Sequence, residues 1–477
     1  MPSAEGRSWS QAFAMAGATL VLGYAVLVIG DRLPDYGWDG TLYGRITEQE
    51  PFRFLVRRKG NLDPYYVRRM LPTWVLHHVL SLLRIDLVMD NIIRAYQILN
   101  LLVLVGASMT WSRISARMSI SSRGAWLGWA ALFLCCGNAK LAYWYAVLTD
   151  TTAFALGVFT LWAYLRGWSW LVFLLTVIAS YCWPSAPLLG MVLFVLPRRE
   201  LAAEARQDGS RAFTWLAAGL AFAATLAGTI YVHWLGGWKE NTGAELLRWL
   251  APISVLTAAG MAGAATYVLV DSRATWPPRL SWGILWRLPL AVAWIWFVGW
   301  SISQIAWGES NLTTGRFVLE VLWHAIIAPG QALVAHTVFF GPIIVLLMLR
   351  LRAAGRAAQA HGPGMVLLLL LFAAQFLHPE SRRIINLYPF LVFVIVQAVD
   401  EELTPAAVLT FVGLSLLYSR AWDSFDVPER LSNWRVYVYF MTQGPWLRMT
   451  MWVAQGLGVI MTLVTFRLLM PRRRSAE

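Results

Sequence analysis

Long apolar segments alternate with short polar segments along nearly the whole chain. A helix needs about 20 apolar residues to cross a bilayer. By this criterion we predict roughly fourteen spans, which we place at residues 11–29, 92–110, 124–137, 149–166, 168–182, 184–197, 213–233, 252–270, 287–307, 331–350, 364–377, 384–399, 404–418 and 446–470. The segments near 124, 168, 184, 364 and 404 are short, so broken or re-entrant helices would leave about eleven to fourteen spans.

The composition agrees with a chain that is surrounded mostly by lipid. Of 477 residues, 58% are hydrophobic and 14% are charged, whereas about a quarter of a soluble domain is charged. Many of the 27 tryptophans stand near the ends of predicted spans, where Trp favours the membrane interface. We therefore expect an all-α polytopic membrane protein whose single transmembrane domain covers residues 1–477.

The charge distribution predicts the orientation of the chain. A net charge of +13 would suggest nucleic acid as the partner of a soluble protein, but here the arginines cluster in short loops. With a cytoplasmic N-terminus the arginine-rich loops all lie inside, as the positive-inside rule requires; only the acidic run 400–402 departs from the trend. We predict cytoplasmic N- and C-termini in a plasma membrane, the inner membrane of a bacterium, with membrane lipids and no nucleic acid as partners.

The first outer loop, residues 31–91, is unusually long and carries spaced carboxylates. Asp39 stands between Gly37 and Gly40, and glycine permits a tight turn and the close approach of a ligand. An aspartate held at the membrane surface can act as a general base. An Asx turn that ends the loop would explain the same residues without any function.

The same loop continues with Asp63, Tyr65, Tyr66, Arg68 and Arg69. From residue 67 to residue 83 the pattern predicts one amphipathic helix that lies at the interface. The two arginines can hold a phosphate through charge-assisted hydrogen bonds. The alternative is that they extend to anionic headgroups without a specific ligand.

Two later polar segments face the same side of the membrane. Asp150 opens the span 149–166, where it can cap the helix or belong to a site. The second segment interrupts two apolar runs and contains His378, Glu380, Arg382 and Arg383. Arginines on the outer side break the positive-inside trend, so we favour a phosphate ligand for them. Pairing with Glu380 or with the first-loop aspartates is the alternative.

No motif identifies a cofactor. The three cysteines lie in apolar spans and predict neither a disulfide nor a zinc site. The histidines at 233, 324 and 336 lack an HExxH arrangement. A divalent metal is possible because several carboxylates share the first outer loop, although no ligand spacing identifies one. The aromatic run 437–446 can line a groove or form part of an interfacial belt.

One short run resembles a known superfamily. Gly37-Trp38-Asp39-Gly40-Thr41-Leu42-Tyr43 is similar to the Gly-Tyr-Asp-Gly-Gln-Phe-Tyr motif of bacterial proteins in the GT-C superfamily of membrane glycosyltransferases. The stretch 68–72 is similar to the Arg-x-x-Pro-like stretch that follows in those proteins. The resemblance covers the first loop and the layout of the spans. Trp38 and Thr41-Leu42 depart from the motif, which leaves the sugar and the acceptor open.

The resemblance implies a GT-C-like bundle with interfacial helices in the first outer loop. It implies a polyprenyl-phosphate-linked sugar as donor, Asp39 as catalytic base and Arg382 as the arginine that holds the donor phosphate. We expect inverting transfer of a hexosyl or pentosyl group to a lipid, glycan or protein acceptor during cell-envelope synthesis. Asp63, Asp150 and Glu380 would position the sugar or the acceptor.

Three other functions fit a polytopic chain. A transporter or lipid flippase predicts charged residues in the middle of spans, whereas here they concentrate at one surface. A membrane acyltransferase needs a catalytic histidine next to polar partners in a span, and the sequence gives no histidine such neighbours. A scaffold of an envelope-assembly complex would look the same in sequence.

Overall fold

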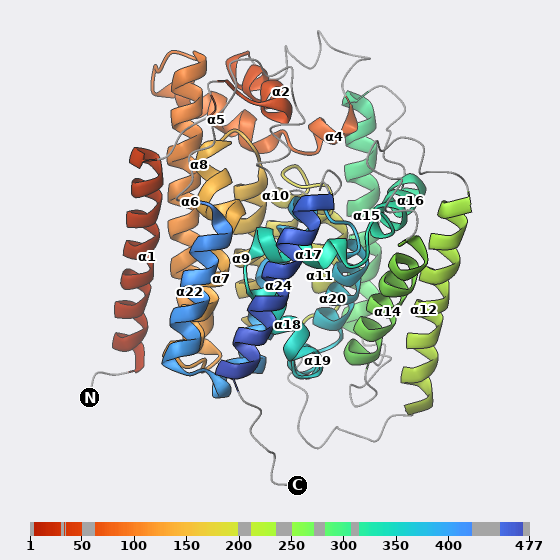
Figure 1. Ribbon diagram of the computed structural model, residues 1–477. Helices are drawn as coiled ribbons and strands as arrows, with labels where there is room; N and C mark the ends of the chain where they lie inside the picture. Colours follow the sequence, from red (N-terminus) through yellow and green to blue (C-terminus); the bar gives the residue numbers. More distant parts are fainter. Residues whose placement is uncertain are drawn as a thin grey trace.

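The computed structural model of the chain describes residues 4–29, 33, 35–49, 63–198, 211–234, 250–270, 282–306, 314–421 and 449–470. Every regular element in these ranges is a helix (Figure 1). The helices are α1 (Ala4–Ile29), α2 (Trp38–Glu48), α4 (Pro64–Val67), α5 (Leu71–Leu82), α6 (Met89–Arg117), α7 (Ser122–Phe133), η1 (Gly137–Leu141), α8 (Ala142–Trp144), α9 (Asp150–Leu165), α10 (Ser169–Ala179), α11 (Ala186–Val195), α12 (Arg211–Trp234), α14 (Ala251–Leu269), α15 (Trp282–Ile305), α16 (Thr314–Ala325), α17 (Gln331–Phe340), α18 (Ile343–Leu349), α19 (Leu351–Ala360), α20 (Pro363–Phe376), η4 (Ser381–Ile384), α21 (Tyr388–Val399), η5 (Asp400–Glu402), α22 (Pro405–Ser419) and α24 (Met449–Leu469). The prediction of an all-α chain is confirmed for the described residues.

Six of these helices are long and apolar enough to cross a membrane, judged by length and composition. They are α1, α6, α12, α14, α15 and α24, and a bent pair made of α7 with η1 and α8 would add a seventh. Five further apolar helices have 10 to 17 residues. Four of these, α10, α11, α20 and α22, fall where the sequence predicted short spans.

Two predicted segments are divided in the structure. The predicted span 331–350 breaks at Gly341, whose φ of +81° ends α17 before Pro342 starts α18. The predicted interfacial helix 67–83 was wrong in its continuity, because α4 ends at Val67 and α5 begins at Leu71. Between them the Leu71 N–H donates to the carbonyl of Tyr181 at 3.0 Å, which holds the break against another part of the chain.

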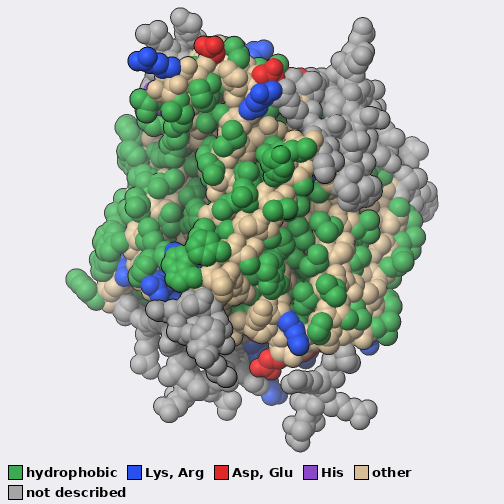
Figure 2. Space-filling model, turned by 90° about the vertical axis from the view of Figure 1, so that its left-hand side faces the viewer, with side chains coloured by type: hydrophobic (Ala, Val, Ile, Leu, Met, Phe, Trp, Pro, Cys, Tyr) green, Lys and Arg blue, Asp and Glu red, His purple; other side chains and the backbone are tan. Residues whose placement is uncertain are grey.

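The core of the bundle surrounds α21, which packs against α7, α9 and α19. Almost every residue of α21 is buried, as expected of a helix that is apolar on all sides. The outer helices instead expose large apolar side chains, among them Phe13, Trp296 and Met461. Figure 2 shows hydrophobic side chains over most of one face, with charged side chains gathered towards its upper and lower ends. Such a surface is typical of contact with a membrane or a partner protein.

The two ends of the bundle differ. Helices α2, α4 and α5 lie at the upper end in Figure 1, whereas α19, the start of α1 and the end of α24 lie at the lower end. The arginine-rich segment 350–356 therefore stands at the end of the bundle opposite α2, α4 and α5. The segment 378–383 joins α20 to α21 and reaches the residues of α2 and α9 that form the candidate site.

Candidate functional site

A tight turn places Asp39 in the first turn of α2. Gly37 precedes the helix with φ +68°, and its N–H donates to Asp35 Oδ1 at 2.8 Å. The Asx-type bond is thus made by Asp35 and not by Asp39. Tyr145 lies beneath the turn, because a Cβ on Gly37 or Gly40 would come within 2.5 or 2.9 Å of its ring. The two glycines of the motif therefore leave room for one buried aromatic side chain.

Asp39 is held only loosely by its neighbours. The Tyr65 hydroxyl donates to Asp39 Oδ2 at 3.4 Å, and Arg382 Nη2 lies 3.9 Å from the same oxygen. The Asp39 side chain is 29% exposed. Long contacts and partial exposure leave this carboxylate free to accept a proton from a ligand, as a general base must do.

Asp150 has a different environment, although it faces the same guanidinium. Arg382 donates from Nε and Nη2 to the two oxygens of Asp150 at 2.7 and 3.0 Å, and the Asp150 side chain is only 12% exposed. This bidentate geometry is the strongest form of such a pair. Burial by itself would lower the pKa of Arg382, but Asp150 raises it well above its usual value. Arg382 is therefore charged and already neutralised.

Arg69 is buried in the site, and no described residue forms an ion pair with it. It is 4% exposed, and its guanidinium stacks between the rings of Tyr65 and Trp183, with centroids 4.1 and 4.0 Å from Cζ. Its Nε and Nη1 atoms have no hydrogen-bond partner among the residues that the structure describes. A buried cation with unsatisfied donors is costly, and stacking on aromatic rings offsets only part of that cost. An anionic ligand would satisfy these donors.

Arg383 belongs to a second cluster that includes α16. It donates to Glu380 Oε2 at 2.6 Å and to the two oxygens of Glu320 at 2.8 and 3.3 Å. Burial alone would raise the pKa of Glu380, but Arg383 and His378 lower it to about 2. Both carboxylates are thus ionised, and they neutralise Arg383. For this arginine the structure has the pairing that the sequence left as the alternative to a phosphate.

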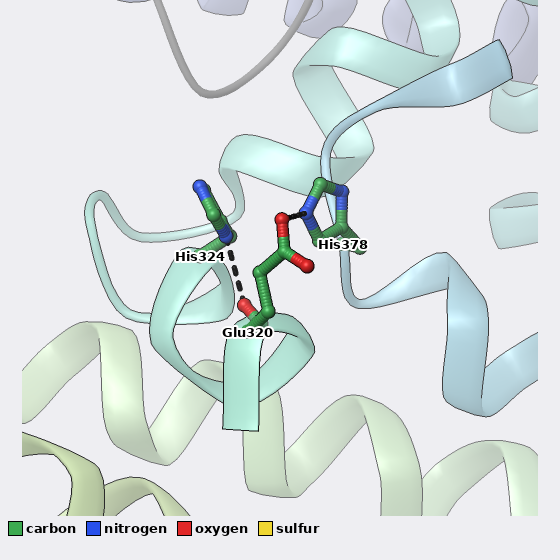
Figure 3. A group of neighbouring side chains, drawn as sticks. All are labelled: Glu320, His324 and His378. Atoms are coloured by element: carbon green, nitrogen blue, oxygen red, sulfur yellow. Dashed lines mark hydrogen bonds and ion pairs between the residues drawn. The ribbon is translucent and has the colours of Figure 1, made fainter. Parts of the chain in front are cut away.

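Two histidines complete this cluster, and Figure 3 shows them, His324 and His378, on either side of Glu320. Ligand atoms of Glu320, His324 and His378 lie within 4.8 Å of one another, a spacing that a metal ion could use. The hydrogen bonds argue against it. His378 Nδ1 accepts the Glu380 N–H, and His324 Nδ1 faces the Glu320 carbonyl at 2.8 Å, which can only accept. In neutral rings the protons therefore sit on His378 Nε2 and His324 Nδ1. The lone pair of His378 Nδ1 already accepts a hydrogen bond, so only His324 Nε2 has a lone pair left for a metal ion.

Other predicted site residues have local structural roles. Asp63 accepts the Tyr65 N–H at 2.8 Å and caps α4. Arg68 is half-buried; burial lowers its pKa, and nearby Asp63 offsets only part of that effect. Tyr66 packs edge-on against Tyr65 and Tyr43, with ring centroids 5.1 and 5.7 Å apart, and its hydroxyl also donates a hydrogen bond to the Asp39 carboxylate.

The structure thus brings together six of the predicted residues, Asp39, Tyr65, Tyr66, Arg69, Asp150 and Arg382, with the cluster of His378, Glu380 and Arg383 directly beside them. Sequence reasoning missed Tyr145, Trp183, Glu320 and His324. Only the last two carried a signal, because a spacing of four residues puts both on one face of a helix. The aromatic run 437–446 lies outside the described residues.

One argument from the sequence was wrong. Histidines with polar neighbours do occur: His336, inside α17, contacts Ser381 Oγ at 2.8 Å and the Phe376 carbonyl at 2.9 Å. The carbonyl requires the proton on Nε2, so Nδ1 accepts from the serine. Both ring nitrogens are used in packing, and neither can act as the base of an acyltransferase without breaking these bonds.

Comparison with known proteins adds no assignment. No protein-family model, curated protein or solved structure matches this chain.

Proposed function

We propose that the protein is a polytopic membrane glycosyltransferase of the GT-C type, which transfers a sugar from a polyprenyl-phosphate donor to an acceptor hydroxyl with inversion. The observation that carries the proposal is Arg69, a buried guanidinium with free donors beside a loosely held carboxylate. Tyr65 contacts both groups, since its ring stacks on Arg69 and its hydroxyl reaches Asp39. The side chain that would bind the anion and the side chain that would accept the proton thus both contact Tyr65.

The charge balance assigns the phosphate to Arg69 in preference to Arg382, which the sequence resemblance favoured. Arg382 is neutralised by Asp150, and Arg383 by Glu320 and Glu380. A phosphate near either would meet carboxylates that already hold the guanidinium. Arg69 can donate from Nε and Nη1, and arginine suits the planar, bidentate recognition of phosphate oxygens. Arg382, 3.9 Å from Asp39 Oδ2, would then orient that carboxylate.

The same comparison selects the base. The acceptor O–H would lose its proton to Asp39 while its oxygen forms a bond to the anomeric carbon. The bond from that carbon to the phosphate oxygen breaks, and the electron pair leaves with the polyprenyl phosphate. Arg69 stabilises the charge that develops there. A base of this kind contributes about 10²- to 10⁴-fold in rate. Asp150 is unsuited to the role because Arg382 occupies both of its oxygens.

The position of the site suits a lipid-linked donor. The site lies towards one end of a bundle whose outer helices expose apolar side chains, and a polyprenyl chain in the bilayer would present its phosphate at that level. We further propose that the shorter apolar helices complete a bundle of about eleven to fourteen spans, with the site on the extracytoplasmic face. No nucleotide-sugar site is needed, because the donor already resides in the membrane.

The test is to reconstitute the purified protein in liposomes that contain a panel of polyprenyl-phosphate-linked sugars, and to measure the free polyprenyl phosphate released with candidate acceptors present. Release from one donor supports the transferase and names the sugar. Movement of an intact labelled lipid between leaflets without release would support a flippase instead. If neither occurs with any donor, the proposal is wrong and a scaffold role becomes the better account.

A further inference from the structure

A second cavity lies at the end of the bundle opposite Asp39. A wide cavity of about 1290 Å³ is lined by residues of α12, α14, α18 and α19. Its lining has two characters: arginines at 350, 352 and 356 on one side, and small or aromatic residues such as Gly219, Gly263, Trp215 and Tyr267 on the other. One wall is cationic and the other is apolar, so the cavity matches a lipid that carries an anionic headgroup next to a hydrocarbon chain.

Two of the three arginines are available to a ligand. Arg350 donates from Nε to the two oxygens of Glu402 at 2.8 and 3.1 Å, and its charge is neutralised. Arg352 and Arg356 are exposed, and no described residue forms an ion pair or a hydrogen bond with either side chain. They stand four residues apart, so both project from the same face of α19. Together they present two unneutralised charges to the cavity.

The cavity continues into an apolar slot of about 180 Å³ between α14, α18, α19, α20 and α21. Ala264, Val268, Met348 and Leu351 line both spaces, so the two are contiguous. The slot extends past Phe372 and Phe376 into the bundle. A hydrocarbon chain fits this surface, whereas a free anion would leave it empty.

The walls of the cavity are fixed by bonds between the helices. Gln359 of α19 donates to the carbonyls of Val268 and Leu269 at the end of α14, at 3.0 and 3.2 Å. Thr214 of α12 donates to the Val270 carbonyl at 3.2 Å. The Trp215 and Tyr267 rings lie 4.7 Å apart, and such residues favour the headgroup level of a bilayer. The site is therefore preformed.

We infer that this cavity binds one anionic phospholipid of the inner leaflet, with its phosphate on Arg352 and Arg356 and one acyl chain in the apolar slot. The inference rests on the membrane placement but not on the transferase activity. The lipid would hold α12 and α14 against α19 at the end of the bundle remote from the candidate catalytic site. Basic residues that are present only because of the positive-inside rule would not bind one particular lipid in preference to others.

The test is native mass spectrometry of the delipidated full-length protein, titrated with phosphatidylglycerol or phosphatidylcholine. We expect one phosphatidylglycerol to bind in preference to phosphatidylcholine. The double variant Arg352→Gln with Arg356→Gln should weaken phosphatidylglycerol binding on the order of tenfold.

The matched control is Arg113→Gln with Arg117→Gln, an exposed pair at the same spacing on α6. This double variant should bind phosphatidylglycerol as the wild type does. Ala264→Phe, which obstructs the slot and keeps the arginines, should also weaken binding.

Equal affinity of the wild-type protein for the two lipids would overturn the inference. So would an equal loss of phosphatidylglycerol binding in the two arginine double variants. Either result would indicate a non-specific lipid shell. Full competition by millimolar inorganic phosphate would overturn it too, because the apolar slot would then contribute nothing. Since the readout is lipid binding, the result is independent of whether the protein transfers a sugar.

Discussion

The Tyr145 hydroxyl accepts a hydrogen bond from the Gly40 backbone N–H at 3.2 Å, while the Tyr145 ring fills the space beside Gly37 and Gly40. These residues are about a hundred positions apart in the chain, yet together they fix the start of α2 and hence the position of Asp39. The short motif around Asp39 is thus explained by packing: its glycines are needed because a buried ring lies against the backbone.

A first prediction concerns Gly40→Ala. The new Cβ would lie 2.9 Å from Tyr145 Cε2, so α2 must shift, at a cost of about 1–3 kcal/mol in unfolding free energy. Because Asp39 moves with the helix, activity should fall further than stability alone explains. The control is Gly17→Ala in α1, where nothing lies within 4 Å of the added Cβ. A wild-type melting temperature and activity for Gly40→Ala would contradict the packing argument.

A second prediction separates the two neighbouring arginines. Arg69→Met should lower kcat/KM on the order of 10- to 100-fold, because charge-assisted hydrogen bonds to the donor phosphate are lost. The melting temperature of the ligand-free protein should stay the same or rise, since a buried cation with unsatisfied donors is removed. Arg68→Met, at the half-buried neighbour, should change kcat/KM far less. A large drop in stability for Arg69→Met would instead identify a structural residue.

A third prediction concerns the buried pair of Asp150 and Arg382. Asp150→Ala should destabilise the protein by about 3–5 kcal/mol, because the guanidinium of Arg382 loses its bidentate partner inside the protein. Adding Arg382→Met should restore much of that stability without restoring activity. The measurement is a double-mutant cycle on thermal or denaturant unfolding. Purely additive effects of the two substitutions would show that the pair is not coupled.

A fourth prediction tests the membrane placement. All three native cysteines are buried, so an impermeant maleimide should label the wild-type protein poorly in intact cells. Asp86→Cys, an exposed position between α5 and α6, should react from outside. Glu401→Cys, an exposed position between α21 and α22, should react only after the membrane is opened. Labelling of both positions from the same side would contradict the proposed orientation.

Much of the site was predictable because its residues broke a pattern. Asp39, Asp150 and the arginines at 382 and 383 are ionisable groups at the edges of apolar runs, where burial demands a partner or a ligand. Their pairing was not predictable: Arg382 and Asp150 are separated by 232 positions, and no local rule chooses between Asp150, Asp39 and a phosphate. The partner of Arg382 decides which arginine remains available for a phosphate. Because the structure pairs Arg382 with Asp150, the proposed phosphate contact moves to Arg69.

The fold was predictable from the sequence to about the same extent as the site. Hydropathy located all six helices that are long and apolar enough to cross a membrane, because helices in contact with lipid must be apolar along their length. It predicted loops where the structure has α2, α16 and α19. It could not locate the break at residues 68–70, which depends on a hydrogen bond from Leu71 to the remote carbonyl of Tyr181. It also overlooked Glu320, which stands in a segment predicted as a loop; the structure has helix α16 there, and this helix places Glu320 beside Arg383.

The most direct test of the central claim is the rate of polyprenyl phosphate release by the wild-type protein and by Asp39→Asn, each with its best donor and acceptor. Asp86→Asn, at an exposed carboxylate between α5 and α6, is the matched control. The account predicts that Asp39→Asn folds normally and loses about 10²- to 10⁴-fold in rate, while Asp86→Asn keeps wild-type turnover. Wild-type turnover by Asp39→Asn would contradict the account.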